Sequence, residues 1–428
     1  MTPATLLLAA DAAPSDALVT NPAIVLGILL SILAIIFQTT DHPVFRRFYR
    51  VVPALLLCYF VPGLLATLGL VGDDGGRLYH VASRYLLPAC LVMLTMTADL
   101  PGILRLGPKM IAVFLAATVG VVVGAPLAVL LVGSISPGTV GGTDADAVWR
   151  GLSTVAGSWI GGGANQAAMK EVFQPSDDLF SAMVAVDVIV ANIWMGILLW
   201  MAGSNLAIDR RLRADRTALD ALDARLREIE KTAPPRPSRT TDLMTIAALG
   251  FMATGIATVL GGWLAGWFEA EVPWSGRFSL TSAFFWLVVI STTIGVALSF
   301  ARPVRRLESA GASKIASVFL YLLVATIGLK MDLLAIGERP GLFAIGLVWI
   351  GIQAVFVLGT TVLLRAPIFF AAVGSQANIG GAASAPVVAA AFDPRLAPVG
   401  VLLAVVGYAL GTYGAWLAAQ LMRIASGG

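Results

Sequence analysis

Two glycine-rich segments, residues 157–166 and 374–384, carry the side chains of this sequence that could bind a solute or an ion. Each segment combines several glycines with hydroxyl and amide side chains inside an otherwise apolar stretch. In a membrane such side chains are costly unless they face protein or water. The candidate substrate-binding residues are Ser158, Gly161, Gly162, Gly163, Asn165, Gln166, Asn378, Gly380, Gly381 and Ser384. We predict that the two segments form the two halves of one transport site.

A break in a helix gives each segment a way to bind charged groups. The break exposes backbone N–H groups at the start of one helical arm, where the helix dipole favours an anion, and free carbonyl oxygens at the end of the other, which suit Na⁺. Glycine permits the turn and a close approach of the ligand. The alternative is that the glycines only allow close helix packing. The amide side chains beside them in both segments favour binding.

Asp187 lies well inside an apolar run, residues 178–202, where a carboxylate is costly without a partner or an ion. We predict a role as Na⁺ ligand or proton carrier, and the alternative is a structural hydrogen bond to a neighbouring helix. The predicted ion-coupling residues are Asp187, Asn192, Ser375 and Gln376. Lys170 and Glu171 are predicted to pair with charges on neighbouring elements.

The composition indicates the class of protein, and this class determines which kind of element carries these residues. Of the 428 residues, 58% are hydrophobic and 12% are charged, far from the balance of a soluble domain. Apolar runs of roughly 20 residues, the length that crosses a bilayer, predict an all-α polytopic membrane protein. The ten predicted spans are 22–39, 51–71, 81–99, 109–132, 178–202, 242–267, 279–300, 313–333, 341–364 and 397–421. The basic residues cluster in loops, so we expect a lipid bilayer and no nucleic acid as partner.

The segments around the two glycine clusters, 150–175 and 367–393, have apolar arms that are too short to cross the membrane singly. An arm of about eleven residues reaches roughly 16 Å, half of a hydrocarbon core about 30 Å thick. Each segment is therefore either a re-entrant hairpin or a crossing helix that is unwound in the middle. Hairpins, with the N-terminus outside, place more Lys and Arg residues on the cytoplasmic side, so we favour them.

Two hairpins leave five spans in each half, and an odd number makes the second half an inverted copy of the first. The predicted parts are an external tail (1–21), repeat 1 (22–202), a charged cytoplasmic helix and linker (203–241) and repeat 2 (242–422). Inverted repeats with broken elements near mid-membrane are the architecture of secondary transporters.

Three runs, residues 52–60, 157–173 and 377–386, resemble a bacterial membrane family described as domain of unknown function 819. That family resembles, more distantly, the sodium/glutamate, 2-hydroxycarboxylate (citrate) and bile-acid sodium symporters. The resemblance implies an elevator motion of a core against a scaffold, in a homodimer of the bacterial cytoplasmic (inner) membrane. It implies nothing about the substrate.

We predict no enzymatic activity and no cofactor other than Na⁺ as a coupling ion. An intramembrane protease needs a Ser with a His, paired Asp residues or a His-Glu zinc motif, and His42 and His80 lie in or beside loops. The sequence around Ser158 resembles a nucleophile elbow only superficially, because no strand precedes it. The predicted function is secondary active transport of a small organic anion or amino acid, coupled to Na⁺ in preference to H⁺. An ion channel or a membrane sensor with the same fold is the alternative.

Overall fold

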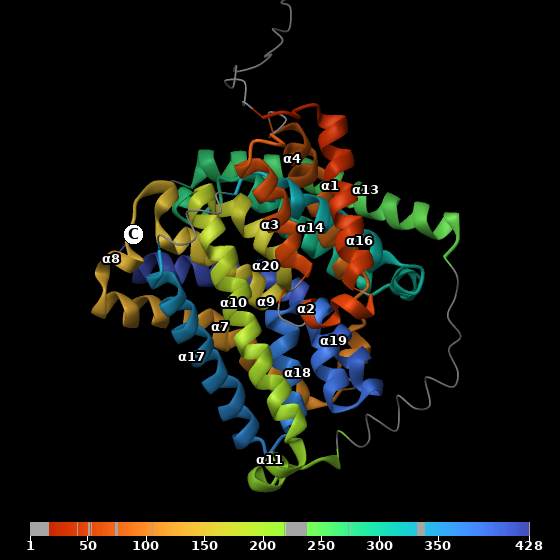
Figure 1. The fold of residues 1–428 in the computed structure, drawn as a ribbon, viewed down its shortest axis with the longest axis vertical. Helices are drawn as coiled ribbons and strands as arrows, with labels where there is room; N and C mark the ends of the chain where they lie inside the picture. The colour runs from red at the N-terminus through yellow and green to blue at the C-terminus, as the bar shows by residue number, and fades with distance from the viewer. Residues whose placement is uncertain are drawn as a thin grey trace, which may run out of the picture. The chain divides into compact units, whose positions relative to one another are not determined.

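The fold is known from a computed structural model, and all its regular secondary structure in the described residues is helical (Figure 1). The described residues are 17–40, 42–49, 52, 54–72, 76–104, 106–217, 219, 238–272, 274–331 and 339–427. Within these residues one isolated β-bridge is found, between Val19 and Val71. Parts of the predicted external tail, residues 1–16, and of the predicted linker helix, residues 218 and 220–237, lie outside the described residues.

Seven helical segments in the described part of the chain are long and apolar enough to cross a membrane. They are α1 (Pro22–Thr40), the segment Arg77–Met96 that ends in α5 (Leu87–Met96), α7 (Pro108–Ile135), α10 (Asp177–Gly203), α13 (Thr240–Glu271), α17 (Gly341–Leu363) and the segment Pro394–Ala425 that contains α20 (Ala397–Ala425). The prediction of an all-α polytopic membrane protein is confirmed.

Three of the ten predicted spans are shorter than a full crossing. Helix α3 (Ala54–Thr67) has 14 residues, and α14 (Ala283–Ser299) and α16 (Ala312–Gly328) have 17 each. Helix α3 stops just before Gly69, whose φ of 67° is a left-handed conformation that ends helices. The chain bends by 103° between α14 and the short segment Arg302–Glu308. The predicted ten full-length spans are thus reduced to seven, or eight if α14 is counted with that bent segment.

The smaller of two compact units consists of Met1–Ser83 together with Tyr321–Leu333. Within it α1 packs against α3. The ring of Phe37 on α1 lies 4.6 Å from the ring of Tyr321 on α16, measured between centroids.

The larger unit consists of Arg84–Leu320 and Leu334–Gly428 and contains both glycine segments. Helices α5, α13 and α14 pack on one another within it. Helix α7 packs along α17, and α10 also contacts α17 (Figure 1). The order of a long helix, a glycine segment and a second long helix occurs twice in this unit, first from α7 to α10 and then from α17 to α20.

The start of α10 shows why its predicted boundary, residue 178, was nearly correct. Ser176 caps the helix by accepting a hydrogen bond from the Leu179 backbone N–H at 3.2 Å. Asp177 and Asp178 occupy the first turn, where the helix dipole favours negative charge. This cap fixes the register of α10 and therefore the depth of Asp187.

Helix α11 (Asn205–Leu212), just beyond the end of α10, holds the base of the second glycine segment (Figure 1). The buried Asp209 carboxylate accepts a hydrogen bond from the Ile368 backbone N–H at 2.8 Å. It also pairs with Arg216 at 2.6 Å. Further along, Asp215 pairs with Lys109 at 2.9 Å. The Thr217 hydroxyl and then Lys109 hold the pKa of the Asp215 carboxyl well below its usual range.

Candidate functional site

The first glycine segment is a helical hairpin, α9 (Val148–Phe173). Its backbone leaves helical geometry at Gly161 and Gly162, and Gly162 has a φ of 69°. The Arg150 Nη1 donates a hydrogen bond to the Phe173 carbonyl oxygen at 2.6 Å, although the two residues are 23 positions apart. A continuous helix would separate them by about 34 Å. The segment therefore turns back on itself, and its two ends lie together.

The second glycine segment is also a helical hairpin, formed by α18 (Ile368–Ile379) and α19 (Gly381–Phe392). The turn lies at Gly381, where φ is 56°. Near the base of the hairpin the rings of Phe369 and Phe392 are 5.3 Å apart. Of the two alternatives that the sequence left open, both segments adopt the hairpin.

The tips of the two hairpins meet at Tyr408 of α20. A Cβ atom built on Gly162 would lie 3.9 Å from the Cα of Gly381 and 3.4 Å from Cε1 of Tyr408. A Cβ atom on Gly381 would lie 3.5 Å from the Tyr408 hydroxyl. That hydroxyl also accepts a hydrogen bond from the Ala382 backbone N–H at 3.4 Å. Gly161, Gly163 and Gly380 flank these two turns.

Asn165 fixes the first hairpin to α20. Its Nδ2 donates to the carbonyl oxygens of Gly161 at 3.1 Å and Tyr408 at 3.0 Å. Its Oδ1 accepts from the Thr412 hydroxyl at 2.8 Å. Gly407 and Gly411 of α20 permit this close contact, because a side chain on either would meet hairpin atoms at 2.9 Å or less. The amide of Asn165 is fully hydrogen-bonded and buried, so in this conformation it holds the hairpin.

Asn378 fixes the second hairpin to α7. Its Nδ2 donates to the carbonyl oxygens of Gly374 at 3.0 Å and Phe114 at 3.3 Å. Its Oδ1 accepts from the Thr118 hydroxyl at 2.8 Å. The two asparagines that we predicted at the ligand therefore position the hairpins, and their side chains are bound to protein in this conformation.

Asp187 of α10 lies against the first hairpin and is 4% exposed. Its carboxylate accepts hydrogen bonds from Trp159 Nε1 at 2.7 Å and Gln166 Nε2 at 2.9 Å, one from each arm. The Trp159 and Gln166 donors are neutral, and no Lys or Arg in the described part of the chain forms an ion pair with this carboxylate. Ser158, next to Trp159 in the chain, is buried as well. A buried carboxylate without a cationic partner is the arrangement that a proton or a metal cation would complete.

A second buried polar cluster surrounds Ser375 on the second hairpin. Its hydroxyl oxygen accepts from Trp194 Nε1 of α10 and from Gln353 Nε2 of α17, both at 2.8 Å. Next to Ser375, Gln376 donates to the Ser384 hydroxyl at 2.7 Å. Within the described residues the amide oxygens of Gln353 and Gln376 are buried and have no hydrogen-bond partner. Unsatisfied buried carbonyl oxygens are suited to a water or a cation.

Asn192 is the predicted ion-coupling residue that the structure leaves apart from these clusters. It donates to the Val188 carbonyl oxygen in its own helix at 2.7 Å, and no hydrogen bond joins it to Asp187 among the described residues.

The predicted pairing of the charges at the end of the first hairpin is confirmed. Lys170 pairs with Asp177 at 2.8 Å, and Glu171 pairs with Arg84 at 3.7 Å.

Four of the residues that build the site were not predicted from the sequence: Trp159, Trp194, Gln353 and Tyr408. Gln353 could have been found, because it is the lone amide within the apolar run of α17. The tryptophans and the tyrosine gave no comparable signal, since aromatic residues in membrane helices are commonly packing residues.

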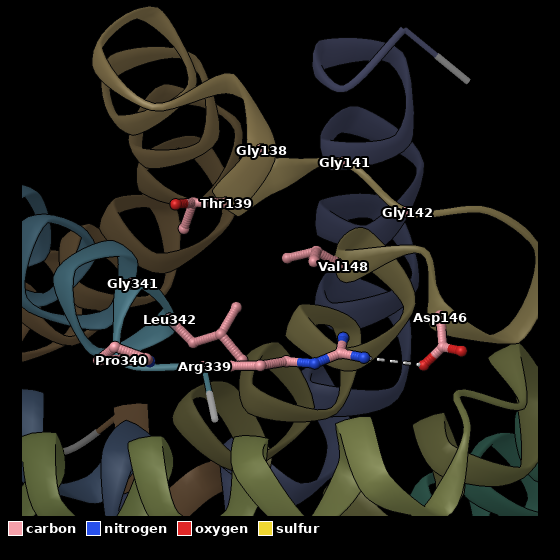
Figure 2. A pocket seen from close by; sticks show the side chains of 10 residues that line it. All are labelled: Gly138, Thr139, Gly141, Gly142, Asp146, Val148, Arg339, Pro340, Gly341 and Leu342. Carbon is pink, nitrogen blue, oxygen red and sulfur yellow. Dashed lines mark hydrogen bonds and ion pairs between the residues drawn. The ribbon is translucent and has the colours of Figure 1, made fainter. Parts of the chain in front are cut away.

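A cavity of about 450 Å³ lies beside the start of the first hairpin, and none of the predicted site residues lines it. Figure 2 shows Arg339, which precedes α17, reaching across it toward Asp146; the two side chains pair at 3.3 Å. The positive charge in this cavity is therefore compensated by a carboxylate.

These features define a class: polytopic helical membrane proteins in which two glycine-tipped hairpins meet beside a buried carboxylate. The chain belongs to the family described as protein of unknown function (DUF819), whose model matches residues 27–425. It is 23% identical over 351 residues to the uncharacterized membrane protein YjcL of Bacillus subtilis (strain 168). The aligned region covers 78% of this chain and 81% of that protein. The family that the three sequence runs predicted is thus confirmed.

Proposed function

We propose that this protein is a secondary active transporter of a small organic anion or amino acid, coupled to Na⁺ in preference to H⁺. The observation that carries the proposal is the meeting of the two hairpin tips at Tyr408, with both arms of the first hairpin bonded to the buried Asp187. Transporters bind substrate and coupling ion at such breaks in helices, where backbone groups are free. We expect no enzymatic activity.

The coupling ion in this proposal binds near Asp187 or near the amide oxygens of Gln353 and Gln376. A carboxylate and neutral oxygen atoms are the ligands that hard cations take in proteins. The amide oxygens have no partner among the described residues, and Asp187 has only neutral donors there. Both observations favour the binding of a monovalent cation at these groups over a permanent salt bridge to a Lys or Arg side chain.

The substrate in this proposal binds at the hairpin tips, where Gly162 and Gly381 form the turns. The two halves of the chain act as inverted repeats, and a core that carries the hairpins moves as an elevator against a scaffold. We further propose a homodimer in the bacterial cytoplasmic membrane with the N-terminus outside. The order of long helix, hairpin and long helix occurs twice, which supports the proposal of two repeats.

The first test is the thermal stability of the purified protein in NaCl and in choline chloride, repeated with a panel of carboxylates and amino acids. A ligand that binds only the folded state adds about 2.7 kcal/mol at a hundred times its Kd. We expect Na⁺ to stabilise the protein and one solute class to add to that effect. Uptake into liposomes under a Na⁺ gradient then identifies the substrate.

The Asp187→Asn variant tests the ion site, and Asp178→Asn, an exposed carboxylate in the first turn of the same helix, is its matched control. We expect Asp187→Asn to remain folded and to lose the response to Na⁺, while Asp178→Asn keeps it. If Asp187→Asn transports at the full rate, Asp187 has no part in coupling. If neither Na⁺ nor pH changes stability or uptake, symport is rejected and a channel or sensor becomes the leading function.

A further inference from the structure

Helix α11, which follows α10 in the chain, has one face turned into the protein and one exposed face. It contacts α18, and its buried Asp209 accepts the hydrogen bond from the Ile368 N–H at 2.8 Å. The exposed face combines apolar and basic side chains: Leu206, Ala207, Arg210 and Arg211. Positions with this spacing lie on one side of a helix, so α11 is amphipathic. The transport site proposed above does not use its exposed face.

The end of α10 places α11 near the lipid headgroups. Helix α10 has 27 residues and is therefore about 40 Å long, whereas the hydrocarbon core of a bilayer is about 30 Å thick. Large exposed apolar side chains follow one another along α10 to its last turn: Ile189, Ile193, Ile197 and Trp200. Tryptophans exposed on spanning helices are enriched at the membrane–water interface. Because α11 starts at Asn205, just beyond Trp200, it lies at the level of the headgroups (Figure 1).

The arginines on the exposed side of α11 carry charge that no carboxylate neutralises. Arg210, Arg211 and Arg213 are exposed, and none of them forms an ion pair within the described residues. Arg216 differs from them, because it is half-buried and paired with Asp209 at 2.6 Å. Basic residues directly beyond a spanning helix attract anionic lipids, and each adds to the affinity.

We propose that the exposed face of α11 binds the headgroups of anionic lipids, with its three unpaired arginines on the phosphate groups. A guanidinium group can bind a phosphate through two parallel hydrogen bonds. Leu206, which is 57% exposed, adds an apolar contact at the boundary with the acyl chains. Because the opposite face of α11 holds the start of α18 through Asp209, the bound lipid also stabilises the base of the second hairpin. The proposal requires no particular substrate or coupling ion.

Lipid binding is measured by native mass spectrometry while phosphatidylglycerol or phosphatidylcholine is titrated into delipidated protein in detergent. We expect the wild-type protein to bind phosphatidylglycerol more tightly. The triple variant Arg210→Gln, Arg211→Gln, Arg213→Gln should bind it about tenfold or more weakly. The matched control Arg210→Lys, Arg211→Lys, Arg213→Lys keeps the charges and should keep most of the affinity. Since the three residues are exposed and unpaired, the lipid-free variants should unfold at the wild-type temperature.

The effect on the second hairpin is measured by hydrogen–deuterium exchange in nanodiscs of the two lipids. The reporter is the start of α18, where the Ile368 N–H is bonded to Asp209. We expect slower exchange in phosphatidylglycerol than in phosphatidylcholine for the wild type and the Lys control, and equal exchange for the Gln variant.

The proposal is overturned if phosphatidylglycerol is not preferred, or if the Gln variant binds it as tightly as the wild type does. Equal exchange of the wild-type protein in the two lipids would overturn the effect on the hairpin. The response to Na⁺ is measured in detergent without these lipids, so the transport proposal stands or falls separately.

Discussion

Asn165 and Asn378 make the same set of hydrogen bonds to two different helices. Each donates to the carbonyl oxygen of the glycine four positions before it and to a carbonyl oxygen on a neighbouring long helix. Each accepts from the threonine one turn further along that helix, Thr412 for Asn165 and Thr118 for Asn378. The same pattern of hydrogen bonds therefore fixes the first hairpin to α20 and the second hairpin to α7.

We expect Asn165→Ala and Asn378→Ala to cost similar amounts of stability, about 1–3 kcal/mol each, because each leaves buried polar groups unsatisfied. Reversible unfolding in mixed micelles measures the loss. Asn192→Ala, which removes one local bond from a half-buried residue, is the control and should cost far less. A double-mutant cycle of Asn165→Ala with Thr412→Val should show coupling of about 0.5–3 kcal/mol. Additive effects would mean that this hydrogen bond contributes nothing.

Alanine at either hairpin tip should strain the turn. Gly162 and Gly381 have positive φ angles, which cost a residue with a Cβ about 1–2 kcal/mol. Gly196 of α10 is the control, since a Cβ there would meet nothing within 4 Å. We expect Gly162→Ala and Gly381→Ala to lower the unfolding temperature and to reduce uptake, and Gly196→Ala to leave both unchanged or to raise stability. Normal uptake by both tip variants would show that the turns tolerate side chains.

Labelling of introduced cysteines should show that the first hairpin enters and leaves on one side of the membrane. Ala145 and Asp178 are exposed and flank the hairpin, whereas Arg210 lies beyond the far end of α10. The native Cys58 and Cys90 are buried, so background labelling is low. We expect Ala145→Cys and Asp178→Cys to react from the same side with an impermeant maleimide in intact cells. Arg210→Cys should react from the other side, and reaction of the first two from opposite sides would mean a crossing segment.

Loss of Asp209 should loosen the base of the second hairpin. Its carboxylate accepts the hydrogen bond from Ile368 N–H at the start of α18, and a helix cap is worth about 0.5–2 kcal/mol. We expect Asp209→Ala to destabilise the protein by this amount or more. Arg216→Gln removes only the half-exposed ion-pair partner and should cost little. Equal losses in the two variants would assign the effect to the ion pair.

The sequence predicted the spans best where the ends carry local signals. For α10, Ser176 and the two aspartates mark the start, and the predicted span 178–202 differs from Asp177–Gly203 by one residue at each end. The span predicted at 51–71 was too long, because apolar residues continue beyond the glycine turn that ends α3. A hydropathy profile detects apolar side chains, but it does not detect the backbone turn at which a helix ends.

The site was predictable only in part, because its polar contacts join residues far apart in the chain. Asp187 could be predicted from the sequence, because a carboxylate within an apolar run is costly unless it has a partner. Its donors Trp159 and Gln166 become partners only when the hairpin packs on α10. No spacing in the sequence indicates that Asn165 faces Thr412 rather than a substrate.

The position of Tyr408 has a consequence for how the protein is made. Tyr408 touches both hairpin tips, and it lies in α20, which leaves the ribosome after both hairpins. Until then Asn165 in the first half lacks its two partners on α20 and keeps only the hydrogen bond to Gly161 in its own hairpin. A nascent chain that stops short of α20 therefore leaves buried polar groups of its first hairpin unsatisfied, which is costly in a membrane.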